Sequence, residues 1–185
     1  MALSKIDVAN MLTGATPVAN GGTGLSSGTS GQFLKFTGST TLASAADNGK
    51  IAQVLGVQKT DKASTSSTSY ADISGLSQAI TPSATSSKIL IMVSIKGIAS
   101  DNSTTDALNL RLMRDSTQLS EAAGITFGST EQDNQSCPIV FLDSPSSTSE
   151  LTYHMEFKSR LSNSSSINNT SGDDDSELVV MEVLA

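Results

Sequence analysis

A period of two in the apolar residues is the feature that most constrains what this chain can fold into. In residues 151–161, Tyr153, Met155, Phe157 and Leu161 share one face, and Thr, His, Glu, Lys and Arg residues fill the other. Successive side chains of a β-strand point to opposite faces of a sheet. The pattern therefore predicts an antiparallel strand with one buried and one solvated face.

Similar segments continue from about residue 47 to the C-terminus, separated by short clusters of Pro, Asn, Asp, Ser and Gly that favour turns. The remaining strand candidates are residues 51–59, 67–73, 76–80, 88–98, 108–114, 138–142 and 177–184. Roughly seven to nine short strands with such connections are typical of a sandwich or jelly roll. We therefore expect an all-β, antiparallel, jelly-roll-like β-sandwich over residues 47–185.

Two of these segments, residues 89–93 and 178–183, are apolar on both faces. One face can fill the sandwich core, but the other needs a second cover. We expect symmetry-related copies of the chain to supply it, and a threefold axis to relate them. The alternative is a central strand covered by long loops of the same chain.

Residues 15–46 form a Gly/Ser/Thr-rich connector that can neither build a core nor form a helix. Within it, residues 32–36 and 41–43 could pair as a hairpin. A two-stranded hairpin is marginally stable alone. We therefore expect Phe33, Leu34 and Phe36 to be covered by the other chains of a trimeric neck; the alternative is a flexible linker.

Residues 1–14 carry the only hint of helical spacing, and Gly14 would end such a helix. One interpretation is an unstructured terminus. The other is a short segment that docks into a larger particle through its apolar residues. The docking candidates are Ile6, Val8, Met11 and Leu12.

The glycine tract NGGTGL (Asn20–Leu25), followed by GTSGQ (residues 28–32), Leu34 and Gly38, resembles the connectors of bacteriophage tail-fibre and virion-appendage proteins. The phrases PIVFLDSP, LTYHMEFKS and ELVVMEVLA resemble the C-terminal tips of marine phage fibres. This resemblance implies a trimeric β-sandwich tip on a virion. Because only 14 residues precede the connector, attachment to the tail, to the capsid or to another fibre subunit stays open.

Charge and composition exclude several classes of protein. The net charge is −7, and the 11 Lys and Arg residues are scattered. The chain therefore lacks a basic surface for nucleic acid, and we expect no membrane insertion either, because its apolar runs are too short. A single cysteine, Cys137, permits no internal disulfide and suits assembly in a reducing host cytoplasm.

Catalysis finds little support in the sequence, and we expect no enzyme. His154 is the only histidine, and Cys137 at a strand start is expected to act as a small buried hydrophobe. A glycan-active enzyme would need a pair of acids such as Asp106, Glu121, Glu131 or Asp143, and nothing in their spacing brings two of them together.

The three adjacent carboxylates Asp173, Asp174 and Asp175 are the one concentrated charge feature. They could supply oxygen ligands for Ca²⁺, although they do not match the spacing of a known calcium loop. A solvated turn is the simpler interpretation. We expect no cofactor.

The expected function is that of a non-enzymatic virion structural protein, a homotrimeric tail fibre or similar appendage that contacts a host surface glycan or protein. Long polar loops of the sandwich would make this contact, and the N-terminal segment would bind other virion proteins. A capsid decoration or spike protein is the alternative. The receptor-contact candidates are Asn102, Asp133, Asn134, Asn163, Asn168 and Asn169.

Overall fold

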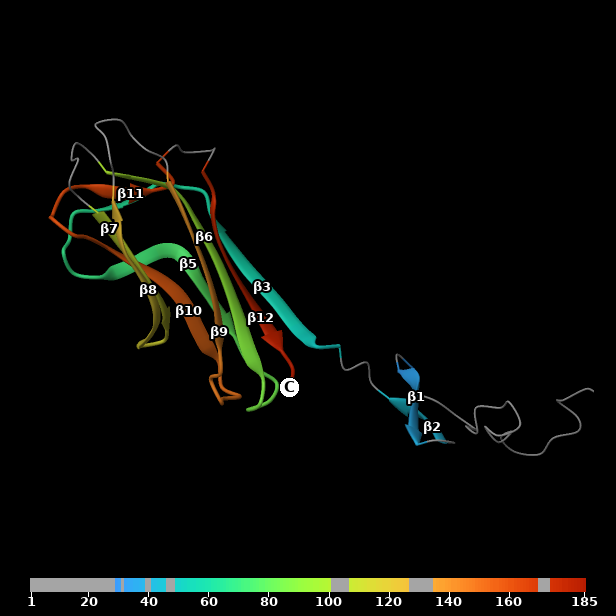
Figure 1. Ribbon diagram of the computed structural model, residues 1–185. Coiled ribbons are helices and arrows are strands. Elements are labelled where there is room, and N and C mark those ends of the chain that lie inside the picture. Colours follow the sequence, from blue (N-terminus) through green and yellow to red (C-terminus); the bar gives the residue numbers. More distant parts are fainter. Residues whose placement is uncertain are drawn as a thin grey trace, which may run out of the picture. The chain divides into compact units, whose positions relative to one another are not determined.

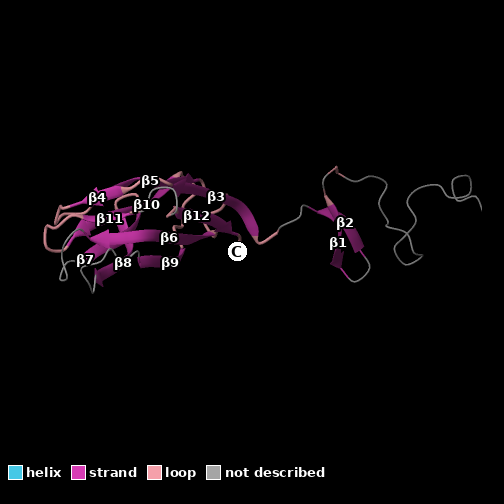
Figure 2. Cartoon of the chain, turned by 90° about the horizontal axis from the view of Figure 1, so that it is seen from above, coloured by secondary structure: helices cyan, strands magenta, loops and turns pink. Residues whose placement is uncertain are grey.

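The computed structural model describes residues 29–30, 32–38, 41–45, 49–100, 107–126, 135–169 and 174–185. The docking candidates in residues 1–14 lie outside this part of the chain. Contacts divide the protein into two units, Met1–Asn48 and Gly49–Ala185. Every secondary-structure element in the described residues is a β-strand (Figure 2).

The described part of the first unit contains an antiparallel hairpin. Strands β1 (Phe33–Gly38) and β2 (Thr41–Ala45) pair so that Phe36 lies opposite Leu42. The predicted pairing of residues 32–36 with 41–43 is therefore confirmed. The side chains of Phe33, Leu34 and Phe36 are 63%, 54% and 67% exposed, so the hairpin does not cover its own apolar residues.

The second unit is an antiparallel β-sandwich of two sheets, which confirms the predicted fold class (Figure 1). One sheet has four strands in the order β5-β10-β7-β8. The other has six, in the order β3-β12-β6-β11-β4, with β9 paired to β6. The strands are β3 (Ile51–Lys59), β4 (Ala63–Thr65), β5 (Ala71–Ile80), β6 (Lys88–Ser100), β7 (Ala107–Arg114), β8 (Thr117–Thr126), β9 (Gln135–Asp143), β10 (Leu151–Ser159), β11 (Ser165–Ile167) and β12 (Ser176–Val183).

The core lies between the inner faces of these sheets and follows from the alternation of their sequences. In β6, Ile89, Ile91 and Ile95 are fully buried, and they belong to one apolar cluster with Tyr153 and Met155 of β10. Full burial of a large apolar side chain contributes about 1.5–3 kcal/mol. Replacement of any one of them by alanine would also leave a cavity.

Several strand predictions need correction. Residues 67–73 and 76–80 do not form two strands: β5 runs through Gly75, whose φ of +88° accommodates an irregularity in the pairing. Strands β4, β8 and β11 were not predicted. Leu161, expected inside, is 51% exposed, because β10 ends at Ser159 and alternation no longer fixes its direction.

The final strand is held inside a sheet. Strand β12 pairs with β3 on one side and with β6 on the other (Figure 1). Just beyond it, the Leu184 amide donates to the Lys50 carbonyl over 2.8 Å. The chain therefore enters the sandwich next to the place where it ends.

A buried carboxylate fixes this end of β12. The Glu182 side chain is fully buried and accepts hydrogen bonds from the Ser83 amide, the Ser83 hydroxyl and the Gln53 amide group over 2.6 Å each. Burial by itself would raise the pKa of Glu182, but these hydrogen bonds lower it to about 2. Glu182 therefore stays ionised and connects β12 to β3 and to the turn after β5.

Candidate functional site

The outer side of the six-stranded sheet carries two rows of apolar side chains, which we call the apolar face. Strand pairing aligns one row across β3, β12, β6 and β9, and a second row lies one pleat further along. The first row is Val54, Met181, Leu90 and Leu142, and the second is Val179, Met92 and Val140 beside Gly56. In both rows every side chain is uncharged.

Much of the apolar face is open to solvent in the described chain. Val140, Val54 and Leu142 are 69%, 57% and 52% exposed, and Met92 is 37% exposed. A shallow hollow of about 260 Å³ lies over the second row. The prediction of apolar residues on both faces is confirmed for residues 89–93, whereas in residues 178–183 the inner face also carries the buried Glu182. No described loop covers the outer face. A contiguous exposed apolar patch of this kind is typical of an interaction surface.

The connections that carry the receptor-contact candidates start and finish at one end of the sandwich. Strand pairing places Ile98 opposite Gln135, Ala107 opposite Thr126, and Ser165 opposite Ser100. The segments 101–106 and 127–134 therefore leave from and return to the same end as the turn before β11. Asn102, Asp133 and Asn134 lie outside the described residues, and Asn163 is partly exposed in that turn.

The prediction of a receptor contact is wrong for Asn168. Its side chain is fully buried, and its amide donates to the Lys59 and Asp61 carbonyls over 2.8 and 3.1 Å. Its carbonyl oxygen accepts from the Ser176 hydroxyl over 2.6 Å. Asn168 therefore holds β3 and β12 together. Its neighbour Asn169, which accepts from Lys62, remains partly exposed and stays a candidate.

The predicted acidic cluster has different surroundings at each described position. The Asp175 carboxylate accepts from Gln58 over 3.0 Å. Asp174 lies against Gly97, where φ is +57° and an added Cβ would come within 2.5 Å of the carboxylate. Asp173 lies outside the described residues, so a Ca²⁺ site here stays a prediction.

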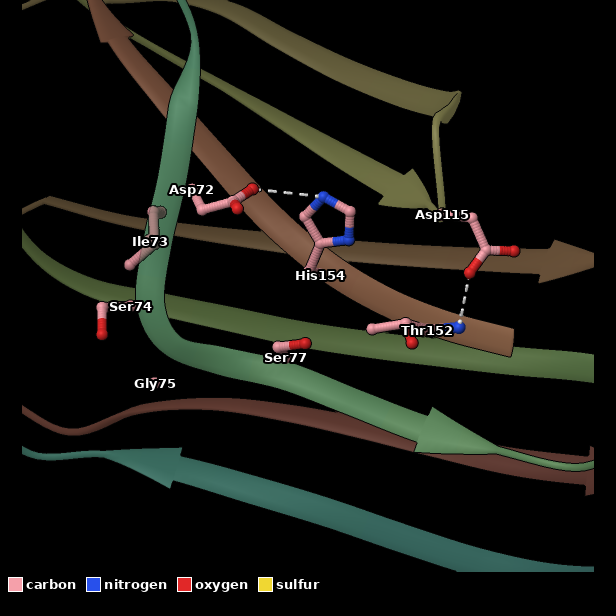
Figure 3. A pocket seen from close by; sticks show the side chains of 8 residues that line it. All are labelled: Asp72, Ile73, Ser74, Gly75, Ser77, Asp115, Thr152 and His154. Atoms are coloured by element: carbon pink, nitrogen blue, oxygen red, sulfur yellow. Dashed lines mark hydrogen bonds and ion pairs between the residues drawn. The ribbon is translucent and has the colours of Figure 1, made fainter. Parts of the chain in front are cut away.

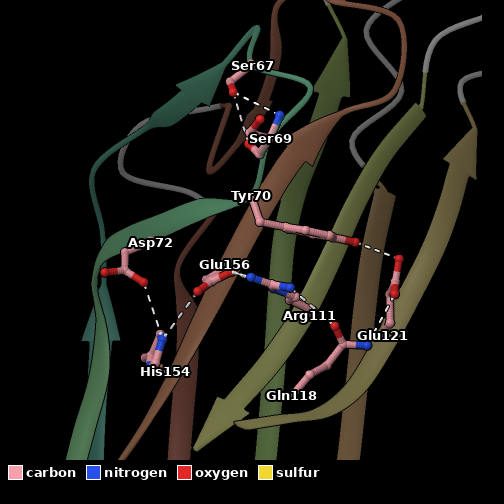
Figure 4. A network of polar contacts seen from close by, with 9 residues as sticks. All are labelled: Ser67, Ser69, Tyr70, Asp72, Arg111, Gln118, Glu121, His154 and Glu156. Carbon is pink, nitrogen blue, oxygen red and sulfur yellow. Dashed lines mark hydrogen bonds and ion pairs between the residues drawn. The ribbon is translucent and has the colours of Figure 1, made fainter. Parts of the chain in front are cut away.

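The outer side of the four-stranded sheet is polar, in contrast to the apolar face (Figure 4). The Arg111 guanidinium forms an ion pair with Glu156 and lies 4.1 Å from the centre of the Tyr70 ring. The Tyr70 hydroxyl donates to Glu121 over 2.6 Å. Burial and this hydrogen bond raise the pKa of Tyr70 to about 12, so the hydroxyl keeps its proton.

His154 lies at one edge of this polar network, beside a cavity of about 580 Å³ (Figure 3). Its Nε2 is 3.3 Å from an Asp72 carboxylate oxygen and 3.6 Å from a Glu156 oxygen. The cavity follows from the β5 irregularity: His154 lies opposite Ser77, whereas Glu156 lies opposite Asp72. Residues 73–76 of β5 therefore lie opposite the single residue Met155 of β10.

The alternating sequence of β10 indicated that His154 and Glu156 share its polar face. Their partners were not predicted, because Asp72, Arg111 and Tyr70 come from segments whose order in the sheet is set by long-range pairing. Only the strand order brings these side chains together.

The residues weighed for catalysis are separated by the fold. Cys137 lies on β9 of the six-stranded sheet and packs against the core, and burial raises the pKa of its thiol. His154 lies on the outer side of the other sheet, so the two do not form a nucleophile–base pair. The described acids take part in separate networks: Glu121 accepts from Tyr70, and the buried Asp143 accepts from Tyr153 and Arg114. Asp106 and Glu131 lie outside the described residues.

No family model and no curated protein sequence matches the chain. Among solved structures, the infectious bursal disease virus VP2 subviral particle aligns over 82% of the chain and 41% of its own, at 13% identity and a TM-score of 0.40. The Gt strain of the same virus aligns over 82% and 42%, at 12% identity and a TM-score of 0.43.

The chain thus spans about two fifths of the length of these viral structures. With TM-scores below 0.5, the likeness carries no argument about function. In the described residues there is also no helix with the length and apolarity needed to cross a membrane.

Proposed function

We propose that the protein is a non-enzymatic virion structural component, a homotrimeric phage tail fibre or similar appendage whose sandwich contacts the host cell surface. The observation that carries this proposal is the exposed apolar face. Copies of a chain with net charge −7 repel one another, and the two uncharged rows on β3, β12, β6 and β9 form a surface on which copies can pack without placing like charges in contact.

The exposed hairpin also supports association with other copies of the same chain. Phe33, Leu34 and Phe36 lack cover within the described residues of their unit, and an isolated hairpin of this size is marginally stable. Association of identical chains would cover both the apolar residues of the hairpin and the apolar face of the sandwich. Closed symmetry is the usual form of such assemblies.

The direction of the strands supports contact with the host at the far end of the sandwich. The chain enters at Gly49 and Lys50, beside the C-terminal residues. Segments 101–106 and 127–134 and the partly exposed Asn163 belong to the opposite end. The chain therefore joins the sandwich at the end opposite to Ser100, Ala107, Thr126 and Gln135, the described residues that border these polar connections. Three copies that bind the host surface together would hold it more tightly than the weak affinity of a single copy allows.

The virion location rests on the resemblance of the glycine tract and the domain phrases to phage fibre proteins. Residues 1–14 would dock on the particle, through Ile6, Val8, Met11 and Leu12. The number of copies per virion distinguishes a tail fibre or similar appendage from the alternative, a capsid decoration protein. A few copies indicate a fibre, and many dozens indicate a capsid decoration protein.

The mass of the purified full-length chain in solution tests the proposal. Size-exclusion chromatography with light scattering should give about 57 kDa, three times the 19.0 kDa chain. A species of 19 kDa that persists at concentrations of tens of micromolar would contradict it. A dimer would retain the apolar face as an interface but overturn the threefold arrangement.

A further inference from the structure

Three potential metal ligands meet on the polar outer side of the four-stranded sheet. Asp72, His154 and Glu156 each offer one ligand atom, and these atoms all lie within 4.8 Å of one another. The His154 and Glu156 side chains are 15% and 12% exposed, whereas that of Asp72 is 75% exposed. The cluster therefore has two partly buried ligands and one that solvent can reach.

The fold fixes two of the three ligands on rigid structure. His154 and Glu156 are two residues apart on β10, a central strand of its sheet, so their side chains point to the same side. Asp72 lies directly opposite Glu156 on β5, just before the irregularity in the pairing. Interruptions of regular strand pairing, such as β-bulges, occur often beside functional sites, where they redirect side chains.

Two of the three distances between ligand atoms suit a tetrahedral ion, and the third, between Asp72 and Glu156, is at most 4.8 Å. In zinc sites, nitrogen and oxygen ligands lie about 2.0–2.2 Å from the metal, which separates neighbouring ligand atoms of a tetrahedral site by about 3.3–3.6 Å. His154 Nε2 is 3.3 Å from Asp72 and 3.6 Å from Glu156. A metal ion could therefore enter with small side-chain movements.

We propose that Asp72, His154 and Glu156 form a binding site for a divalent transition-metal ion, with Zn²⁺ as its best-fitting occupant. An imidazole together with two carboxylates favours zinc over calcium and magnesium, which prefer oxygen ligands alone. The fourth coordination position is left to water or to an incoming ligand. The cavity of about 580 Å³ beside His154 gives that position access to solvent. The site is independent of the proposed virion function.

Arg111 shapes the site from the other side. Its guanidinium binds Glu156 Oε2, whereas Oε1 is the oxygen that faces His154. Arg111 thus orients the carboxylate and leaves one oxygen for the metal, as the outer partners of metal ligands usually do. Its positive charge also lowers the affinity for a cation. We therefore expect micromolar rather than nanomolar binding.

A proton is the competing occupant. Protonated His154 can form ion pairs with both carboxylates at the observed distances, without a metal. The two states differ in a measurable way, because metal binding through Nε2 removes the proton from that atom.

His154 is the only histidine of the chain, so its imidazole gives a unique NMR signal in protein prepared without a histidine tag. Titration of ¹⁵N-labelled full-length protein with ZnCl₂ at pH 7 should shift this signal in a saturable way, at one ion per chain. Titration with MgCl₂ should leave it unchanged. An imidazole signal that does not respond to millimolar Zn²⁺ would overturn the proposal and leave a proton-linked ion pair as the occupant.

Variants assign the ligands. Asp72→Asn changes an exposed side chain and should weaken Zn²⁺ binding by at least about tenfold, because changes even to outer partners of metal ligands cost 10–100-fold. His154→Gln should abolish the one-to-one binding measured by calorimetry. Glu150→Gln removes an exposed carboxylate outside the cluster and should bind Zn²⁺ as the unaltered protein does. Unchanged binding in Asp72→Asn or in His154→Gln would place the metal elsewhere and reject the site.

Discussion

The two sheets of the sandwich share one core but present opposite chemistry on their outer sides. On the six-stranded sheet, aligned rows such as Met181, Leu90 and Leu142 are apolar. On the four-stranded sheet, the corresponding outer positions of β7 and β10 carry charged residues such as Arg111 and Glu156, joined in an ion pair. An outer face with partnered charges is suited to water, whereas an apolar outer face is suited to another protein surface. If copies of the chain associate as proposed, this difference assigns the contact to the six-stranded sheet.

The largest effect on association is expected from a charge placed on the apolar face. Val140→Asp should convert the proposed 57 kDa trimer to the 19.0 kDa chain, because three buried carboxylates without partners would oppose association. Val140 is 69% exposed, so the fold itself should change little. Light scattering and circular dichroism measure the two effects.

The matched control adds the same charge to the other outer face. Gln118→Glu lies on β8 in an exposed position beside Arg111 and should leave the mass at its original value. If Gln118→Glu dissociates the protein as Val140→Asp does, then net charge rather than the apolar face governs association.

Acid provides a second test, because the six-stranded sheet has a carboxylate buried at its inner side. The pKa of Glu182 falls from 4.5 to about 2 on folding, so its contribution to stability is present above pH 4.5 and is lost as the pH falls toward 2. The loss should reach about 3 kcal/mol. Urea unfolding at a series of pH values measures it.

Glu182→Gln serves as the control for this acid effect. The variant should be less stable at pH 7 and should show a smaller decline between pH 4.5 and pH 2 than the unaltered chain. An equal decline in both proteins would assign the acid sensitivity to other carboxylates.

The smallest expected effect comes from the polar face. Glu156→Gln removes the charge that pairs with Arg111 while keeping the shape of the side chain, and should lower the free energy of unfolding by about 1–3 kcal/mol. Because this network lies on the other outer side, the mass in solution should not change. A change of mass would show that the polar face also contributes to association.

The fold was largely predictable because alternation is a local property. The residues expected inside β6 and β10 are buried. They are Ile89, Ile91, Val93 and Ile95 in β6, and Tyr153, Met155 and Phe157 in β10. The exposed apolar rows were predictable for the same reason. Strand β8 was missed because TQLSEAAGIT contains small and polar residues whose pattern does not alternate clearly.

The polar cluster and the role of Asn168 were beyond sequence reasoning. Asp72 meets Glu156 because β5 pairs with β10, a contact between residues 84 positions apart in the chain that no local pattern encodes. Asn168 resembled a loop residue, as its left-handed φ of 49° suggests, yet its amide satisfies backbone groups inside the domain. Composition predicts that such a residue is polar, but only the packing decides whether it faces solvent.

The neighbouring positions of Lys50 and Leu184 have a practical consequence for protein engineering. A peptide or reporter fused after Ala185 would emerge beside the point where the connector joins the domain. Foreign sequences meant for display are therefore better inserted between Ser100 and Ala107, at the opposite end, where they would be presented away from the attachment point.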